Sequence, residues 1–514
     1  MAKRGILRPT LLVILTSILL ALAFPAPSLG ILAWLFLIPL LFSVQNKNFL
    51  QSFKLSFFAG FLANIGIFYW LNIVMTTYGH LPLVLSILLT LMLSAYLALY
   101  IAFPVALAIR AEKSGISLIL SLPLLWVAFE YLRGILLSGF PWAILGYTQY
   151  RTLSIIQIAD ITGVYGISFL IILGNVVIYK IIKSIISKEE AKYPVAGSLV
   201  LLALLVITVW YGFVRLNEPN TGRDLKVGLV QGNISQDIKW DPNYLESTLE
   251  VYERLTRDIA GQNLDLIVWP ESSLPFYFQR DIEHSTRVKN FASEIKSYLV
   301  VGSPAVETTD NVNFKLFNSA FLINPYGEVI GRGDKTHLVP FGEYVPMSKM
   351  LPFVHKMVHG IGDFSPGATI SPLSGSFGNI GILVCFEGIF PEISREYVKK
   401  GANLLVNITN DAWFGRSSAP YQDLSMTVFR AVENKVPLIR AANSGITAII
   451  DSRGHIHGMT PLFKEATLTG KIRLSDEKTI YTAYGDIFAW LCLLGAGIII
   501  LIPFLKSRRK SEIE

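Results

Sequence analysis

The stretch Asn379-Ile-Gly-Ile-Leu-Val-Cys-Phe-Glu-Gly-Ile-Phe-Pro-Glu392 organises this sequence. The apolar run at 380–384 predicts a buried strand. Pro391 suits the first turn of a following helix, where its missing N–H costs nothing. Cys385 therefore falls at a strand-to-helix junction. A side chain at such a junction can point into a crevice, and backbone N–H groups there can face a developing oxyanion.

Cys385 has no evident disulfide partner. The chain holds two cysteines, and the other, Cys492, lies in a long apolar run near the C-terminus. An average free cysteine is buried and acts as a small apolar residue. Here the position of Cys385, together with the carboxylate and lysine motifs described below, favours a nucleophile.

The composition predicts a protein that is part membrane and part soluble. The 514 residues suffice for two or more domains. Hydrophobic residues make up 52% and charged residues only 16%, which lies on the apolar side of ordinary soluble proteins. The net charge of +7 requires no nucleic-acid partner, because much of the Lys and Arg sits in short clusters between apolar runs.

Eight apolar segments predict about eight membrane-spanning helices, although the first two are short for a bilayer. A cleaved signal peptide is the alternative for the first, but residues 24–30 lack a convincing small-x-small cleavage site. If successive segments cross the membrane in alternating directions, all the Lys and Arg clusters lie on the same side of it. Since such clusters favour the cytoplasmic side, both termini are predicted to be cytoplasmic. The segments cover residues 11–24, 30–44, 53–76, 81–109, 116–137, 164–187, 194–214 and 485–506.

These segments define three parts of the chain. Residues 1–215 are predicted to form a transmembrane domain of about seven helices, and residues 484–514 a C-terminal transmembrane helix with a basic cytoplasmic tail. Between them, 216–483 is rich in charges and alternates strands with helices, which predicts a layered α/β domain outside the cytoplasmic membrane. Glu130 and Arg133 share a face of the fifth segment, where a lipid or substrate contact and a structural ion pair both remain open.

Within the α/β domain, strands and helices follow from the apolar patterns and turn residues. The predicted strands are 225–231, 264–269, 298–302, 317–324, 328–331, 380–384, 403–408, 437–441 and 446–450. The predicted helices are 242–260, 281–297, 391–400 and 420–435. Strands 317–324 and 328–331 form a hairpin about Pro325-Tyr-Gly327.

Three motifs carry residues suited to thiol chemistry. Trp269-Pro-Glu271 ends one predicted strand, Lys335 follows the hairpin, and Cys385-Phe-Glu387 ends another strand. A thiol that attacks a carbonyl needs a group to take its proton and a positive charge for the oxyanion. Glu271 can be the base, while Lys335 can hold the oxyanion and lower the thiol pKa. Taken alone, Glu271 and Lys335 are typical of a surface ion pair. The occurrence of Glu271, Lys335 and Cys385 in this order, each in its motif, favours catalysis instead.

The ordered set resembles the Glu-Lys-Cys triad of the nitrilase superfamily, whose domain is an αββα sandwich. The membrane segments and Lys335-Thr-His-Leu-Val-Pro-Phe-Gly-Glu-Tyr-Val-Pro346 narrow the resemblance to the apolipoprotein N-acyltransferases. It covers essentially the whole chain. It includes Gln231-Gly-Asn233 with Trp240, Gly139-Phe-Pro-Trp142 and Asn410-Asp-Ala-Trp-Phe-Gly415. Phe386 departs from the pattern, since the family often has Tyr there, but a ring for packing remains.

The resemblance implies a bacterial enzyme of the cytoplasmic (inner) membrane, with its catalytic domain on the periplasmic or outer face. It would move an acyl chain from a phospholipid to the N-terminal amine of an apolipoprotein's diacylglyceryl-cysteine, through a thioester on Cys385. Glu271 would move the protons, and Lys335 with a backbone N–H near Phe386 would stabilise the intermediate. Glu343 would orient Lys335 or Glu271, and Glu387 is a further supporting candidate. The implied partners are the phospholipid donor, the apolipoprotein acceptor and membrane lipids, without nucleic acid or cofactor.

Other apolar residues are candidates for contact with the substrates. Trp240, Trp142 and Trp413 suit this role, with core packing or interface anchoring as the alternative. Residues 344–367 are rich in methionine and glycine and include Met350 and Phe353. We expect a lid that dips into the bilayer and admits acyl chains, against the alternative of a loop packed on its own domain.

Two other function classes stay open on sequence alone. A membrane-tethered nitrilase-type amidase or hydrolase would pass the acyl group to water. A non-catalytic lipoprotein-binding module is disfavoured, because binding alone does not require Glu271, Lys335 and Cys385 together. His455 and His457 would share a strand face, but no third ligand is evident, so we expect no metal site.

Overall fold

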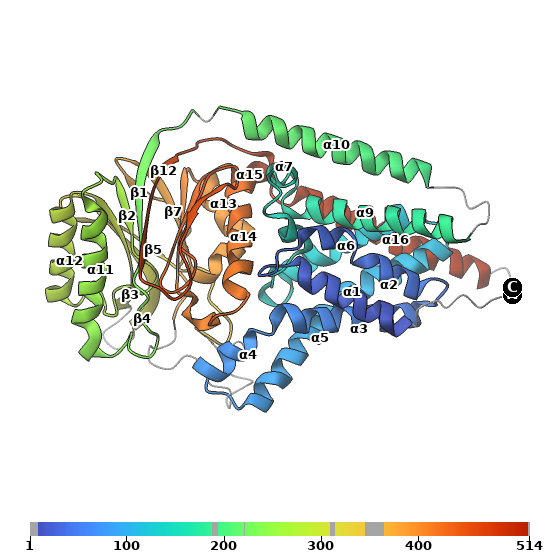
Figure 1. Cartoon of the computed structure of the whole chain (residues 1–514), viewed down its shortest axis with the longest axis horizontal. Coiled ribbons are helices and arrows are strands. Elements are labelled where there is room, and N and C mark those ends of the chain that lie inside the picture. The colour runs from blue at the N-terminus through green and yellow to red at the C-terminus, as the bar shows by residue number, and fades with distance from the viewer. Residues whose placement is uncertain (1–8, 188–193, 220, 309–313, 345–363, 512–514) are drawn as a thin grey trace. The chain divides into compact units, whose positions relative to one another are not determined.

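The computed structural model describes residues 9–187, 194–219, 221–308, 314–344 and 364–511, and from 503 onward the backbone alone. The chain divides into two units (Figure 1). The helical unit comprises Met1–Asn72, Leu83–Asn217 and Tyr484–Glu514, and the sheet unit comprises Ile73–Pro82 and Glu218–Ala483. Ile73–Pro82 therefore belongs to the sheet unit by its contacts, although sequence analysis assigns it to the N-terminal domain.

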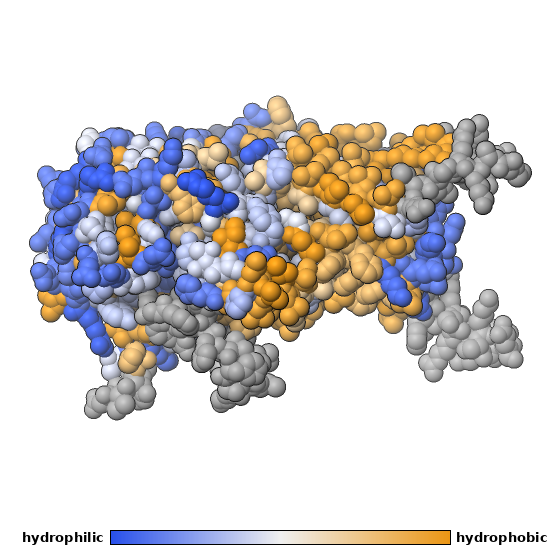
Figure 2. Space-filling view, turned by 60° about the horizontal axis from the view of Figure 1, so that its bottom comes forward, coloured by the Kyte–Doolittle hydropathy of each residue, from blue (hydrophilic) through white to orange (hydrophobic). Residues whose placement is uncertain are grey.

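The helical unit is a bundle of apolar helices, and each predicted apolar segment contains one. Its main helices are α1 (Pro9–Ala23), α2 (Leu37–Val44), α3 (Phe49–Phe68), α5 (Leu83–Lys113), α6 (Leu118–Ile135), α9 (Val164–Ser187), α10 (Val195–Asn217) and α16 (Ile487–Ser511). Short elements join them: η1 (Gly30–Trp34), η3 (Leu136–Ser138), η4 (Leu145–Gln149), α7 (Leu153–Ile156) and α8 (Ala159–Thr162). On the face shown in Figure 2, apolar side chains cover much of this unit, as expected for helices that face lipid.

Five stretches within the described residues are long and apolar enough to cross a membrane. They are Phe49–Phe68, Leu83–Lys113, Leu118–Ser138, Val164–Ile186 and Val195–Asn217. The total of about eight spans stays a prediction, because three of the helices are apolar but shorter over their described residues. They are α1, α2 with its preceding turn, and α16. The third segment is shorter than predicted, because α3 ends at Phe68 and is followed by α4 (Leu71–Ile73) and the π-helical turn η2 (Val74–Tyr78).

Glu130 and Arg133 on α6 are both buried and hold the loop that follows their helix. One carboxylate oxygen of Glu130 accepts a hydrogen bond from the backbone N–H of Leu145 (2.9 Å). The Arg133 guanidinium donates to the carbonyl of Ala143 (3.0 Å). Buried charged groups need such partners. The pair therefore fixes the loop that carries Trp142.

The sheet unit consists of two six-stranded sheets, in the orders β12-β1-β2-β3-β4-β5 and β11-β10-β9-β8-β7-β6. The first sheet contains β1 (Asp224–Gln231), β2 (Leu266–Val268), β3 (Tyr298–Thr308), β4 (Phe314–Ile323), β5 (Val329–Asp334) and β12 (Ala466–Arg473). The second contains β6 (Leu373–Gly375), β7 (Gly378–Val384), β8 (Leu404–Thr409), β9 (Leu438–Ala442), β10 (Ala448–Ile450) and β11 (Ile456–Met459).

Helices cover both outer faces of the paired sheets, so the αββα sandwich is confirmed (Figure 1). One core cluster packs β1, β2 and β3 against β7, β8 and β9, and another packs the first sheet against its two helices. The helices are α11 (Leu245–Ala260) and α12 (Ile282–Ile295) on one face, and α13 (Pro391–Lys399) and α14 (Ala419–Asn434) on the other. Shorter helices are η5 (Pro242–Tyr244), η6 (Cys385–Ile389), η7 (Asp411–Phe414) and α15 (Ile480–Tyr484).

Strand direction brings the candidate residues to one edge of the sandwich. β1, β2 and β3 are parallel, as are β7, β8 and β9. β4 runs antiparallel to both β3 and β5, so β5 ends on the same side as β3. Glu271 follows β2, Lys335 follows β5, and Cys385 follows β7. In parallel sheets, ligands bind beyond the carboxyl ends of the strands.

Three strands, β6, β11 and β12, are absent from the sequence-based prediction. All three lie at or next to sheet edges, where one face meets water and the apolar pattern is weak. β12 nevertheless pairs along the whole length of β1, from Asp224 with Arg473 to Gln231 with Ala466.

A charged network joins α11 to α12 around His284. Its Nε2 lies 2.8 Å from Glu246 Oε1 and its Nδ1 lies 2.7 Å from Asp281 Oδ2. Partial burial lowers the pKa of His284, but the hydrogen bonds to Asp281 and Glu246 outweigh this, and the pKa is raised above its usual value. Arg287 also contacts Glu246 and adds positive charge beside the ring.

We expect His284→Gln to lower the melting temperature of the detergent-solubilised protein more in mildly acidic than in alkaline solution. A histidine whose pKa is raised by folding stabilises the protein below its unfolded pKa of about 6.5, and this contribution is lost as pH rises through the folded value. Thermal unfolding of both proteins at about pH 5.5 and about pH 9 measures the difference. A loss of equal size at both pH values would contradict the network's role.

Candidate active site

Cys385 occupies the predicted junction. β7 ends at Val384, η6 begins at Cys385, and α13 begins at Pro391. The φ angle of Cys385 is 54°, in the left-handed region that costs a non-glycine residue roughly 1–3 kcal/mol. Asn407 supports this turn by donating from Nδ2 to the carbonyls of Leu383 (3.0 Å) and Cys385 (3.3 Å). The turn therefore places Cys385, a residue that is partly exposed as a whole, at the edge of the sheet.

A chain of hydrogen bonds joins Glu271 to Lys335. Asn318 on β4 donates from Nδ2 to Glu271 Oε1 (2.8 Å) and to Glu343 Oε1 (3.1 Å). Glu343 Oε2 pairs with Lys335 Nζ at 2.8 Å, and the orienting role that the resemblance implies for Glu343 stays a prediction. Asn318 was not predicted, because an asparagine within a strand gives no catalytic signal.

Glu271 is buried, and only one of its two carboxylate oxygens has a partner among the described residues. Its Oε2 makes no hydrogen bond within the described part of the chain. An unpaired acceptor in a buried position is costly unless it has another use. The free oxygen is suited to accept a proton, while Asn318 fixes the other.

Lys335 is held as a cation. Burial lowers the pKa of Lys335. The Glu343 carboxylate, then Cys385 and Glu271, raise this pKa by a larger amount, so it lies above its ordinary value. A buried ammonium with this partner retains its charge at neutral pH. It is therefore suited to face a developing oxyanion.

The thiol of Cys385 is held protonated. Burial and the Glu271 carboxylate raise its pKa, whereas Lys335 and the Thr409 hydroxyl lower it by less. The sequence predicts that Lys335 lowers the pKa of Cys385, and Lys335 does act in that direction. The net shift is upward, so the thiol needs a base when it reacts.

Glu387 joins residues 335–337, here the lysine segment, to the turn at Val384 and Cys385, here the cysteine turn. Its Oε1 accepts from the Thr336 backbone (2.6 Å), the Thr336 hydroxyl (2.7 Å) and the His337 backbone (3.1 Å). Its Oε2 accepts from the Val384 backbone (2.8 Å). Burial raises the pKa of Glu387. Glu387 therefore connects the two segments by hydrogen bonds from both of its carboxylate oxygens.

A fully buried charged cluster lies behind the cysteine turn. Arg440 on β9 pairs with Asp411 (2.8 Å) and Asp423 (2.8 Å) and donates to Asn407, which supports Cys385. Thr409 also donates to Asp411 (2.9 Å). The cluster was not predicted, because these residues are far apart in sequence.

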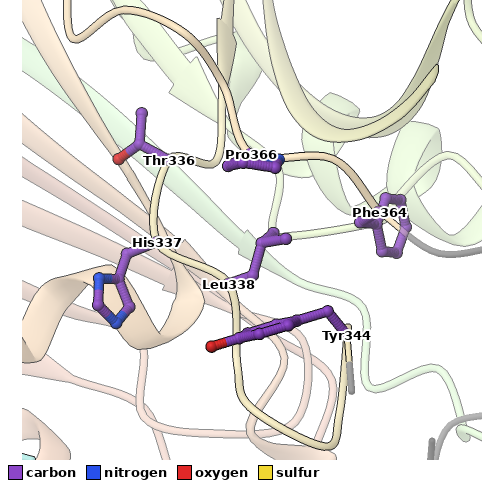
Figure 3. A pocket seen from close by; sticks show the side chains of 6 residues that line it. All are labelled: Thr336, His337, Leu338, Tyr344, Phe364 and Pro366. Atoms are coloured by element: carbon purple, nitrogen blue, oxygen red, sulfur yellow. The ribbon is translucent and has the colours of Figure 1, made fainter. Parts of the chain in front are cut away.

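An aromatic and apolar pocket of about 300 Å³ adjoins the lysine segment. The His337 and Phe390 rings lie 3.9 Å apart between centroids, and Phe386 packs against Phe390 at 5.1 Å. Phe386 thus keeps the packing role expected of its ring. Burial, then Lys335, lowers the pKa of His337, so its ring is neutral. The pocket is lined by Thr336, His337, Leu338, Tyr344, Phe364 and Pro366 (Figure 3).

The predicted substrate-contact residues have different surroundings. Trp240 and Trp413 are partly exposed in the sheet unit, and Trp413 packs edge-on against Tyr78. Trp142, in the helical unit, is buried against Trp70. Substrate contact by these tryptophans stays a prediction. Met350 and Phe353 lie outside the described residues, as does most of the predicted lid.

His455 and His457 lie beside one acidic side chain. Both approach the same carboxylate, Asp451, at 3.4 and 2.9 Å. Across the residues with described positions, no group of three or more His, Cys, Asp or Glu side chains is placed to hold a metal ion.

Two family models match the chain. Residues 16–177 match the apolipoprotein N-acyltransferase N-terminal domain, and residues 226–481 match carbon-nitrogen hydrolase. An apolipoprotein N-acyltransferase of Geobacter metallireducens is 58% identical over 98% of this chain and 96% of its own length. That of Haemophilus influenzae is 34% identical over 70% of each chain. The crystal structure of a carbon-nitrogen hydrolase from Helicobacter pylori is 17% identical, with a TM-score of 0.39 over 51% of this chain and 94% of that one.

Proposed function

The chain belongs to the apolipoprotein N-acyltransferase family of the nitrilase superfamily, and we propose that Glu271, Lys335 and Cys385 carry out its acyl transfer. The proposal rests on one observation above all. A hydrogen-bonded chain runs from Glu271 through Asn318 and Glu343 to Lys335, and among the residues that the structure describes it leaves one Glu271 oxygen unpaired. The charges of Glu271 and Lys335 both act on the Cys385 thiol.

The first half-reaction acylates Cys385. Glu271 takes the Sγ proton, and the thiolate attacks the ester carbonyl of a phospholipid, forming a C–S bond. Lys335 faces the resulting oxyanion. When the C–O bond breaks, the leaving alkoxide takes the proton from Glu271. Lysophospholipid departs and a thioester remains on the enzyme.

The second half-reaction transfers the acyl group to the apolipoprotein. The N-terminal amine of its diacylglyceryl-cysteine attacks the thioester carbonyl, and a C–N bond forms. Glu271 takes one amine proton and returns it to Sγ as the C–S bond breaks. The product is an amide and the enzyme regains its thiol.

The surroundings of the site support an apolar substrate. The pocket beside Lys335 is lined by Leu338, Tyr344, Phe364 and Pro366 among others, and we assign it to an apolar part of a substrate. Trp240 and Trp413 are proposed to contact substrate at the same sheet edge. The long apolar helices support a multi-pass membrane protein. We propose the cytoplasmic (inner) membrane, with the sheet unit on the periplasmic or outer face and both termini cytoplasmic.

The identity of the acyl acceptor tests this function. The full-length protein is incubated in liposomes with acyl-labelled phospholipid and a diacylated lipopeptide. We expect the label in an amide on the lipopeptide, with one lysophospholipid released per amide. A matched lipopeptide with an acetylated N-terminus should accept no label. Release of labelled free fatty acid at the same rate with either peptide would instead support the amidase or hydrolase alternative.

A further inference from the structure

A second buried lysine lies beside the proposed catalytic residues. Lys239 belongs to the loop after β1 and is 1% exposed. Its ammonium donates to the backbone carbonyl of Glu271 at 3.0 Å, the one hydrogen bond of this group among the described residues. Burying an ammonium without a paired carboxylate is costly, and such a group persists where its charge has a use.

The groups that face Lys239 are those of the reaction. The Glu271 carboxylate and the Cys385 thiol both interact with its charge and raise its pKa, but burial lowers it by more, to about 8. Lys335 differs, because the Glu343 carboxylate lies 2.8 Å from its ammonium. One lysine of the site is therefore a fixed cation, and the other loses its proton within the working range of a bacterial enzyme.

The charges of Glu271, Glu343, Lys335 and Lys239 balance one another only when Lys239 is protonated. Glu271 and Glu343 supply two carboxylates, and Lys335 and Lys239 supply two ammonium groups. When Lys239 is neutral, one buried carboxylate lacks its countercharge. Negative charge that develops on Cys385 and on the oxyanion is then less favourable, because like charges at close range in a buried site repel strongly.

We propose that Lys239 is a positioning residue for the first half-reaction, holding Glu271 through its backbone carbonyl and supplying a second positive charge to Glu271 and Cys385. The inference rests on the proposed roles of those two residues. It adds no covalent step, since Lys239 acts by its hydrogen bond and charge and the proton of the thiol still passes to Glu271.

The rate of acyl-enzyme formation against pH tests the role of Lys239. Single-turnover acylation from phospholipid is followed by intact-protein mass between about pH 6 and pH 9.5, around the pKa of this lysine. In the wild type we expect the rate to fall above about pH 8. Lys239→Met should acylate roughly 10–100-fold more slowly at neutral pH, as expected when a catalytic group loses its positioning, and should lack this alkaline fall.

Two further variants separate charge from packing. Lys239→Arg keeps the positive charge to higher pH, so the alkaline fall should move upward by at least about one pH unit. Lys226→Met removes an exposed lysine from β1 and should leave the profile unchanged. If Lys239→Met does not fold, the shift in Lys239→Arg still decides the matter.

The possible results distinguish this inference from the proposed function. A wild type that forms no acyl adduct at any pH would overturn the proposed chemistry itself. A wild type that forms the adduct, with an alkaline fall that neither Lys239 variant moves, would leave the chemistry intact and overturn the role of Lys239. Equal losses in both variants at every pH would show that Lys239 only packs, and would also overturn its role.

Discussion

We expect Cys385→Ala to abolish the acyl-enzyme and to lower turnover by at least roughly 10⁴-fold, the effect of removing the nucleophile of a catalytic set. The variant has no thiol to form the thioester, and the remaining groups only bind and polarise the ester. Intact-protein mass after incubation with phospholipid measures the effect. The wild type should gain one acyl mass that hydroxylamine removes, because hydroxylamine cleaves thioesters, and the variant should gain none.

Cys492→Ala is the matched control for this experiment. Cys492 is the other cysteine of the chain and lies buried in α16, in the helical unit. Its removal should leave both the adduct and its rate unchanged. An adduct that persists in Cys385→Ala and disappears in Cys492→Ala would overturn the assignment of the nucleophile.

Arg440→Met is expected to cost about 3–5 kcal/mol of unfolding free energy, because it leaves a buried cluster with uncompensated negative charge. Asp411 and Asp423 would both face a neutral side chain. Burial already raises the pKa of Asp423, and Arg440 is the group that lowers it. Denaturant unfolding of the detergent-solubilised protein, followed by the tryptophan fluorescence of the sheet unit, measures the loss.

Arg254→Met provides the comparison for an exposed pair. Arg254 contacts Glu465 at the surface, and both side chains are about half exposed. Exposed pairs contribute about 0–1 kcal/mol, so this variant should unfold close to the wild type. Combining Arg440→Met with Asp411→Asn and Asp423→Asn should restore part of the stability, since these three positions then bury no charge. Equal behaviour of Arg440→Met and Arg254→Met would contradict the account of the cluster.

Those parts of the structure that follow from local pattern could be predicted from the sequence. β7 and the start of α13 follow from an apolar run and Pro391, and the hairpin of β4 and β5 follows from its turn residues. The ordered Glu271, Lys335 and Cys385 indicate the proposed site, because each ends or follows a predicted strand. Hydropathy indicated the apolar helices, though it leaves the number of spans open.

Residues whose role depends on the meeting of distant strands could not be predicted in this way. Asn318 lies within β4 and gains its role only because β5 brings Glu343 beside it. Arg440 is an ordinary strand residue until β8 places Asp411 against it. Lys239 lies in a polar loop, where a lysine is usually exposed. Such roles arise from tertiary packing, which a single sequence does not display.

The protonated state of the Cys385 thiol has a consequence for its survival. Oxidants, alkylating agents and disulfides react with the thiolate rather than the thiol, so a cysteine with a raised pKa is slow to be oxidised. The sheet unit is proposed to work outside the cytoplasm, where free thiols are readily converted to disulfides. Its single cysteine is therefore protected by the same burial and neighbouring carboxylate that make a base necessary, and it becomes reactive when Glu271 takes its proton.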